Sequence, residues 1–279
     1  MFMRTSSAIA GMVVFGLSLC APAPRAATFE GGDSARVEKA PLSAYPNPQA
    51  ALRAGIEGFR AGDSTAAIEA LKYAAAGGER LAQWKLAKLY ASGDGVPRDD
   101  LKAYELFSQI VANYDEDNPD RRDAAIVSSA FVALGVYSLN GIENTEVVAN
   151  PQHALQLFQF AATNFGDANA LYNLARMHLD GVGTSKDGIE ALRWLSLAAA
   201  KGHLQAEALL GEMLFAGRDG IQPQRARGLM WLTLAREAAA GSNKDRWIVD
   251  LYEKAVASAN EADRHDALAY LEVHLKRRN

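Results

Sequence analysis

A repeated hydrophobic pattern with helical spacing runs through most of the chain. An alanine is followed by a leucine four residues on, another apolar residue three further on, and a glycine four after that. These steps keep the side chains on one helix face, and a closing glycine suits the left-handed turn that ends a helix. The pattern predicts a helix, which we call helix A, at residues 82–93, 130–141, 170–181 and 206–217, with a degenerate copy at 51–62.

A second helix, helix B, is predicted after each copy. It is marked by a small residue with a large apolar residue three positions later, and a glycine usually ends it. In two copies the connecting loop closes on an aspartate, and Asp99 and Asp187 are therefore predicted helix N-caps. The marker pairs are Ala103 with Leu106, Ala154 with Leu157, Ala191 with Trp194, and Gly228 with Trp231.

This pattern resembles Sel1-like repeats, which are relatives of the tetratricopeptide repeat, over about residues 48–240. The resemblance implies an all-α, right-handed α-solenoid of about five helix-turn-helix pairs. Some copies depart from it: the first lacks the connecting loop, the third has a longer loop, and Gln222-Pro223 replaces the usual acidic loop end in the last. A polar insert at 113–123 is expected to be exposed and open to proteolysis.

Residues 241–279 lack the loop pattern and are expected to cap the repeats. Two helices are predicted, at about 244–259 and 261–276. Apolar side chains should give each helix a face that shields the last repeat. In the second helix these are Ala267, Leu268, Leu271 and Leu275.

The amino terminus has the features of a secretory signal. Arg4 precedes a short apolar run at 8–19, and small residues follow it. We predict a signal peptide at 1–27 and a flexible linker at 28–47. No later stretch approaches the length of a membrane span, so the mature protein is expected to be soluble in the periplasm.

Composition narrows the possible chemistry. The net charge is -4 and no basic tract stands out, which argues against nucleic acid as a partner. The one cysteine, Cys20, lies in the predicted signal. If the signal is removed, disulfides, thiolate metal sites and cysteine catalysis are excluded.

No motif for catalysis, metal or cofactor binding is recognisable. None of the five histidines forms a zinc-binding His-Glu-x-x-His, and no nucleophile elbow is present. The glycine-containing loops follow helices rather than strands, and His178 occupies a repeat packing position. The acids of the insert could bind calcium weakly, but they are more typical of a solvated loop. An enzyme resembling lactamase-like repeat proteins would be expected to carry cysteine pairs, which the mature chain lacks.

A protein partner is therefore the expected ligand. Solenoids present a concave face lined by helix A. By analogy with tetratricopeptide repeats, the positions two before and two after the first leucine of the pattern, which include Ala208, should be exposed there. Aromatic side chains beside charged ones favour binding. An alternative left open is that Trp84 packs against the neighbouring repeat. The predicted partner-binding residues are Trp84, Lys88, Tyr172, Arg176 and Glu212.

The segments 67–75 and 84–87 are also similar to a family of periplasmic negative regulators of exopolysaccharide production. That resemblance implies binding to the periplasmic domain of a membrane sensor histidine kinase, which is held inactive, and release through acid-promoted cleavage by a periplasmic protease. His178 or His203 could respond to pH in this range. A periplasmic scaffold for envelope or secretion assembly is the alternative.

Overall fold

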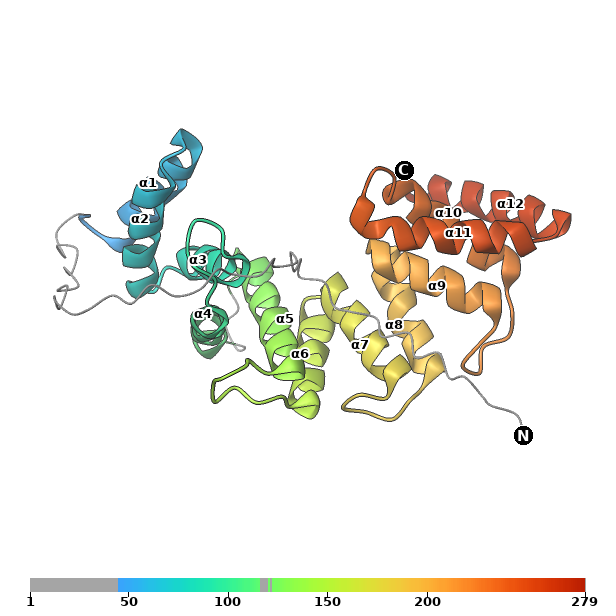
Figure 1. Cartoon of the computed structure of the whole chain (residues 1–279), viewed down its shortest axis with the longest axis horizontal. Coiled ribbons are helices and arrows are strands. Elements are labelled where there is room, and N and C mark those ends of the chain that lie inside the picture. The colour runs from blue at the N-terminus through green and yellow to red at the C-terminus, as the bar shows by residue number, and fades with distance from the viewer. Residues whose placement is uncertain (1–44, 116–119, 121, 279) are drawn as a thin grey trace, which may run out of the picture. The chain divides into compact units, whose positions relative to one another are not determined.

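The computed structural model describes residues 45–115, 120 and 122–278, and every regular element in them is helical (Figure 1). This confirms the all-α prediction. The predicted signal, most of the predicted linker and residues 116–119 of the insert lie outside the described residues. The helices are α1 (Pro48–Ala61), α2 (Ser64–Ala76), α3 (Arg80–Ser92), α4 (Asp100–Ala112), α5 (Ala124–Asn140), α6 (Pro151–Asn164), α7 (Ala168–Asp180), α8 (Gly188–Ala200), α9 (Leu204–Ala216), α10 (Arg225–Ala238), α11 (Arg246–Ser258) and α12 (Glu261–Arg278), with a short 3-10 helix η1 (Asn243–Asp245).

Residues 47–279 form one compact unit with its own core. From α1 to α10 the helices pack as five successive pairs, and the second helix of each pair contacts the first helix of the next. This is the arrangement of an α-solenoid, in which each repeat buries its apolar surface against its neighbours. Within the described residues, no helix is both long enough and apolar enough to cross a membrane.

Glycine ends the helices A, as the pattern predicts. Gly62, Gly93, Gly181 and Gly217 adopt the left-handed conformation as C-caps of α1, α3, α7 and α9. Gly141 after α5 differs, since its φ of 71° is combined with a ψ of 178°. That conformation directs the chain into the longer loop, where the Ile142 amide donates to the Val147 carbonyl at 2.8 Å.

The helix-to-helix loops close in the same way in four repeats. The predicted caps are confirmed: the Asp99 and Asp187 side chains accept amide hydrogen bonds at the starts of α4 and α8. In each loop the amide of the residue before helix B donates to a carbonyl in the last turn of helix A. The carbonyls belong to Tyr90, Ser138, His178 and Leu214. This equivalence supports the interpretation of His178 as a repeat position.

Small residues allow the helices of a pair to approach closely. The helix-A alanines, such as Ala82 and Ala206, are completely buried. A very close approach occurs in the last repeat, where a Cβ on Gly228 would lie 2.4 Å from the backbone nitrogen of Phe215. The alanine and glycine content therefore reflects tight helix packing and not merely helix propensity.

Side-chain contacts link α3 and α5 to the residues that precede the next helix A. Arg80 of α3 pairs with Asp123 before α5 at 2.7 Å, and the Ser128 hydroxyl of α5 donates to Asp167 before α7 at 2.7 Å. In the same way, Gln205 of α9 donates to Asp245 of η1, at the start of the C-terminal cap, at 3.5 Å. These contacts fix the register of neighbouring repeats.

The C-terminal helices cover the last repeat, but not as the sequence predicts. Ile248 of α11 and Ala267 of α12 are buried, and the His274 ring packs against Trp231 of α10 with 4.9 Å between centroids. Leu268 and Leu275, which were expected on the buried face, are 66% and 45% exposed. The prediction for these two leucines is wrong because α12 packs on α10 through the row Asp263, Ala267, Leu271 and His274, which leaves residues 268 and 275 at its side.

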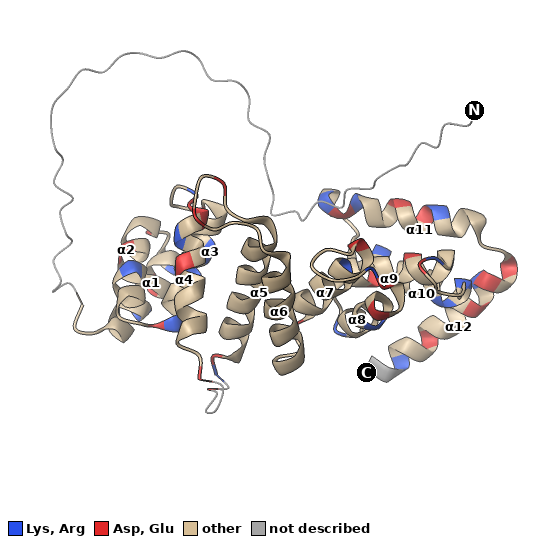
Figure 2. Cartoon of the chain, turned by 90° about the horizontal axis from the view of Figure 1, so that it is seen from below, with Lys and Arg blue, Asp and Glu red and all other residues tan. Residues whose placement is uncertain are grey.

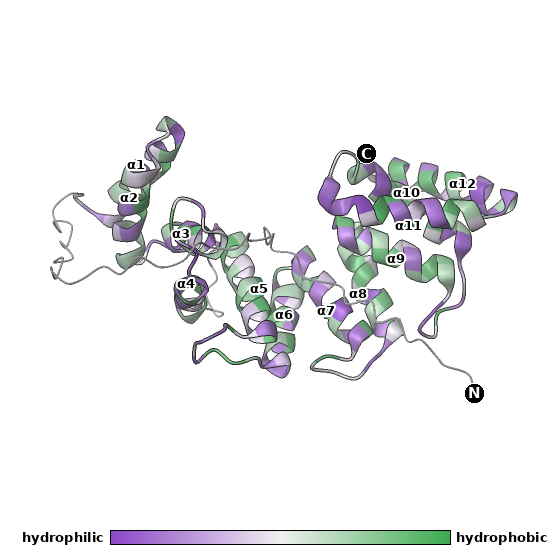
Figure 3. Ribbon diagram, in the orientation of Figure 1, coloured by the Kyte–Doolittle hydropathy of each residue, from purple (hydrophilic) through white to green (hydrophobic). Residues whose placement is uncertain are grey.

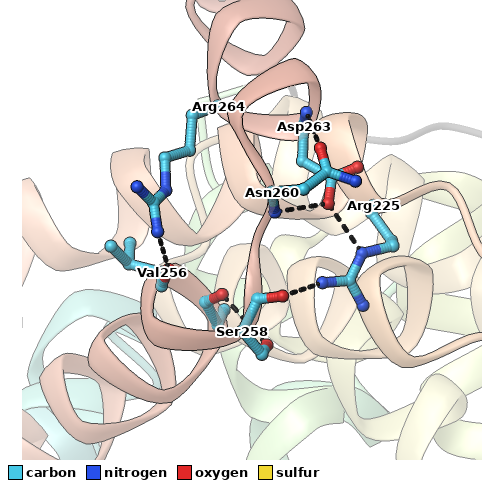
Figure 4. A network of polar contacts seen from close by, with 7 residues as sticks. Arg225, Val256, Ser258, Asn260, Asp263 and Arg264 are labelled. Atoms are coloured by element: carbon cyan, nitrogen blue, oxygen red, sulfur yellow. Dashed lines mark hydrogen bonds and ion pairs between the residues drawn. The ribbon is translucent and has the colours of Figure 1, made fainter.

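A polar network holds the start of α12 (Figure 4). Arg225 of α10 donates to the Asp263 carboxylate at 2.8 Å and to the Ser258 carbonyl at 2.6 Å. The Asp263 amide in turn donates to the side-chain oxygen of Asn260 at 2.7 Å. The guanidinium of Arg225 holds the pKa of the Asp263 carboxyl below its usual range. Helix α12 is thus anchored at its amino-terminal end.

Candidate partner-binding face

The candidate binding face is formed by the outward positions of helices α3, α5, α7 and α9. It comprises Trp84, Lys88, Val132, Val136, Tyr172, Arg176 and Glu212, and we call it the helix-A face. The structure puts these residues at equivalent positions of successive helices A. The predicted partner-binding residues therefore occupy equivalent positions of successive helices A, and their role in binding stays a prediction.

Trp84 serves the packing between repeats as well as the surface. Its indole N–H donates to the Ser129 hydroxyl of α5 at 2.9 Å, and the ring is half-buried. Lys88 is exposed, with its ammonium 4.5 Å from the Trp84 ring centroid. The alternative that Trp84 packs against the neighbouring repeat therefore holds for its hydrogen bond, whereas Lys88 remains available to a partner.

Helix α5 forms an uncharged centre of this face. Its 17 residues include no Lys, Arg, Asp or Glu, and the helix is uniformly tan in Figure 2 and predominantly green in Figure 3. Val132 and Val136 lie half-buried on its outward side. A helix without charged side chains is normally covered by other parts of the protein on most of its sides. The outward side of α5 is thus the part of the face best suited to an apolar partner.

Tyr172 and Arg176 of α7 continue the face on the other side of α5. The Tyr172 ring stacks on the His203 imidazole, with 4.5 Å between centroids and 21° between planes. Burial raises the pKa of the Tyr172 hydroxyl, and the nearby Arg176 opposes this effect. Arg176 also pairs with Asp180 at 3.5 Å. Like Trp84, Tyr172 both contributes to the surface and joins two repeats.

His203 is the N-cap of α9. Its Nδ1 atom accepts a hydrogen bond from the Ala206 amide at 3.2 Å, which requires this nitrogen to be unprotonated. Burial lowers the pKa of the imidazole, and the Asp167 carboxylate acts in the opposite direction. The sequence draws attention to His203 as a pH-responsive candidate, but its capping role is visible only in the structure.

The last repeat departs from the predicted surface. Glu212 is partly exposed and pairs with Arg218 of the following loop at 3.0 Å. Ala208, at the earlier outward position of α9, was expected to be exposed but is completely buried with Ala235, Ala239 and Ile248. That expectation is wrong because α11 packs on α9 and α10. The helix-A face is therefore partly covered at its C-terminal end.

Groups that could form a metal site were sought among the residues that the structure describes. Within the described residues, no three His, Cys, Asp or Glu side chains are placed to hold a metal ion. The acidic residues 116 and 117, candidates for calcium binding, lie outside those residues. A hollow of about 300 Å³ beside η1 is lined by Arg246, Asp250 and Glu253 with backbone and small residues. This mixture of charges is typical of a surface depression.

Ser129 is a contributor that the sequence reasoning missed. It immediately precedes the repeat alanine Ala130, a position at which no specific side chain recurs among the repeats. The available signal was chemical: a half-buried indole needs an acceptor, and a hydroxyl on the next helix A can supply one. Only the packing of α3 against α5 identifies which hydroxyl does so.

Comparison with known proteins supports the repeat assignment. The family model for the Sel1 repeat matches residues 80–113, 130–164, 168–203 and 204–239. These ranges correspond to the pairs α3–α4, α5–α6, α7–α8 and α9–α10. The pair α1–α2, with its short connection, lies outside the matched residues. The structural unit is therefore longer at its amino-terminal end than the matched repeats.

Two curated relatives align along nearly the whole chain. An exopolysaccharide production negative regulator of Rhizobium meliloti (strain 1021) is 34% identical over 270 residues, which cover 95% of each chain. A protein of the same name from Rhizobium leguminosarum bv. viciae is 33% identical, over 92% of this chain and 90% of the relative. The similarity thus includes the C-terminal helices and not only the repeats.

Solved structures share the fold. A Sel1 repeat protein from Oxalobacter formigenes is 25% identical with a TM-score of 0.59, covering 83% of this chain and 88% of that one. A protective antigen of uropathogenic Escherichia coli with an SLR fold gives a TM-score of 0.65 at 23% identity. It is longer, since the match covers 82% of this chain but 46% of that protein. The solenoid architecture is confirmed, and the repeat family and the regulator names together favour a non-catalytic protein.

Proposed function

Because the chain is a Sel1-repeat protein that belongs to the family of exopolysaccharide production negative regulators, we propose that it represses exopolysaccharide production by binding another protein. The observation that carries this proposal is the alignment with the Rhizobium meliloti regulator over 95% of both chains. A shared fold alone would not support a shared role. Alignment beyond the repeats, at this identity, does support it.

The partner in this proposal is the periplasmic sensing domain of a membrane sensor histidine kinase, which the bound protein holds inactive. The helix-A face offers a suitable surface: apolar Val132 and Val136 in the centre, exposed Lys88 on one side and Arg176 on the other. Apolar contact area flanked by basic groups suits a partner segment that carries apolar and acidic residues. The proposed location is the periplasm, and the support for it is the signal-like sequence at 1–27.

Relief of repression is proposed to follow acid-promoted proteolysis. Two features of the chain support this step. The polar insert at 113–123 connects α4 to α5 and contains acidic and proline residues typical of an exposed loop. The N-cap of α9 is a histidine whose capping bond needs a neutral ring. Acidification would weaken that cap in the range where histidine titrates.

The test is calorimetric titration of residues 28–279 with purified periplasmic domains of the host's sensor kinases, near pH 7 and near pH 5.5. The informative variant is Lys88→Glu, because Lys88 is exposed and its replacement leaves the Trp84–Ser129 bond in place. Its matched control is Lys72→Glu on the helix-B side of the first pair, where Lys72 pairs with Glu69. Substitutions of Trp84 and Tyr172 would alter repeat packing as well as the surface.

We expect one kinase domain to bind saturably near pH 7, with Lys88→Glu weakening the affinity by about tenfold, or 1.4 kcal/mol, and Lys72→Glu leaving it unchanged. Equal loss in both variants would reject the helix-A face as the binding surface. Absence of binding to every kinase domain would reject the kinase as partner and turn attention to a scaffold in envelope or secretion assembly.

A further inference from the structure

Helix α12 presents an apolar stripe that no described part of the chain covers. Leu268 and Leu275 lie two turns apart on the same side of the helix, and they are 66% and 45% exposed. Between them Leu271 is half-buried against the core. Exposed single leucines are common on protein surfaces, but a row over two turns beside a buried leucine is the pattern of a helix that packs on two sides.

The stripe belongs to a firmly held helix. Arg225 and Asn260 fix the start of α12 through Asp263, and the Arg264 guanidinium donates to the Val256 carbonyl of α11 at 2.9 Å (Figure 4). Farther along, His274 packs against Trp231. The leucines are therefore displayed on a pre-organised surface, and a partner would not have to order this helix on binding.

The charges beside the stripe are self-complementary. Arg264 lies four residues before Leu268 and Glu272 lies four residues after it, each one helical turn away on the same side. In an antiparallel pair of α12 helices centred on Leu268, Arg264 of one copy would lie opposite Glu272 of the second copy, and this pairing would occur twice. A two-fold symmetric contact requires a surface that complements itself in this way.

From the exposed leucines and this charge arrangement we propose that α12 is a homodimerisation surface, on which the α12 helix of a second copy packs in antiparallel orientation. Leu268 meets its counterpart at the two-fold axis. Arg264 and Glu272 form the flanking ion pairs and set the orientation, in addition to the contacts that Arg264 makes with the Val256 carbonyl and Glu272 makes with Lys276 at 2.6 Å within one copy. Leu275 lies beyond these ion pairs, opposite Glu261 of the second copy, so that the apolar contact is centred on Leu268. The proposal does not depend on the function proposed above, because the helix-A face and the α12 stripe are formed by different residues.

The experiment measures the mass of residues 28–279 by light scattering and sedimentation over a range of concentrations. The compact unit 47–279 contains its own core, so this chain can be studied without the predicted signal. Leu268→Glu tests the stripe. Its matched control is Ile189→Glu on α8, since Ile189 is an equally exposed apolar residue at 67%. Circular dichroism checks that each variant keeps its helical content.

We expect a concentration-dependent dimer for the unaltered chain and for Ile189→Glu, and a dimer dissociation constant at least about tenfold higher for Leu268→Glu. Arg264→Glu and Glu272→Arg should each weaken the dimer, and the double variant should recover it. A chain that stays monomeric at its highest soluble concentration overturns the proposal, and α12 would then be a surface for a different protein. A dimer that Leu268→Glu leaves intact overturns it as well, because the contact would lie elsewhere.

Discussion

Acidification should destabilise the repeats through the N-cap of α9. The His203 ring caps this helix through the Ala206 amide and stacks on Tyr172 of the preceding repeat. Protonation of Nδ1 would replace an acceptor by a donor and place a positive charge at the positive end of the helix dipole. Loss of an N-cap costs about 1 kcal/mol, within a range of roughly 0.5–2 kcal/mol.

The direction of the His203 pKa shift determines how stability changes with pH. Burial lowers the pKa of folded His203 below the ordinary value of 6.5, so the unfolded chain takes up its proton first as the pH falls. The contribution of the neutral cap is therefore complete above pH 6.5 and is lost below it. Between pH 7 and 5.5, titration of one histidine in the unfolded chain limits this loss to about 1.2 kcal/mol.

The assay is urea unfolding of residues 28–279 at pH 7 and pH 5.5, with and without His203→Asn. Asparagine retains a capping oxygen that does not titrate in this range. The His203→Asn variant also loses the ring stacking on Tyr172, but this changes the free energy of unfolding equally at both pH values. The difference between the two pH values within one protein therefore does not contain it. His265→Asn is the matched control, because the His265 side chain is 83% exposed on α12 and contacts the carboxylate of its neighbour Asp266 at 3.2 Å.

We expect His203→Asn to lose up to about 1 kcal/mol less stability on acidification than either the unaltered chain or His265→Asn. An identical loss in all three proteins would show that the acid sensitivity arises from groups other than His203. If only His265→Asn lost less stability on acidification, the acid sensitivity would be assigned to α12. The outcome also bears on the proposed acid-promoted proteolysis, for which a weakened repeat junction would be the structural cause.

Two further predictions concern packing. Gly228→Ala should lower the free energy of unfolding in urea by about 1–3 kcal/mol through overpacking against Phe215, and an unchanged value would mean that α9 and α10 separate at little cost. Arg225→Ala should speed amide hydrogen exchange in α12 by about tenfold, because it removes the contacts to Asp263 and Ser258, whereas the exposed Arg227→Ala should not. Equal exchange in both variants would show that the Arg225 network does not hold α12.

Local chemistry made much of the fold predictable. The closing glycines and the caps Asp99 and Asp187 occupy the predicted positions because their conformations and hydrogen bonds involve only nearby backbone. The loop of Gly141 follows another conformation because it is longer and forms its own internal hydrogen bonds. Periodicity predicted which residues share a helix face, as the buried helix-A alanines show.

The candidate site was less predictable. The sequence placed Trp84, Tyr172 and Ala208 at equivalent outward positions, but their surroundings differ. The first two are half-buried by contacts to Ser129 and His203, and the third is enclosed by α11. Residues at equivalent positions have the same kinds of neighbours within their own repeat. Their contacts with the next repeat differ, because they depend on residues that do not recur in the repeat pattern.

The helical repeats, their ends and their apolar faces could be derived from the sequence, because they depend on residues within a few positions of one another. Only the packed structure shows which outward residues remain accessible, that His203 caps α9 and stacks on Tyr172, and that α12 packs on α10 through Ala267 and leaves Leu268 exposed. Burial and pairing depend on the angle at which helices distant in sequence meet, which no local pattern encodes. Periodicity specifies a face but not the neighbour that covers it.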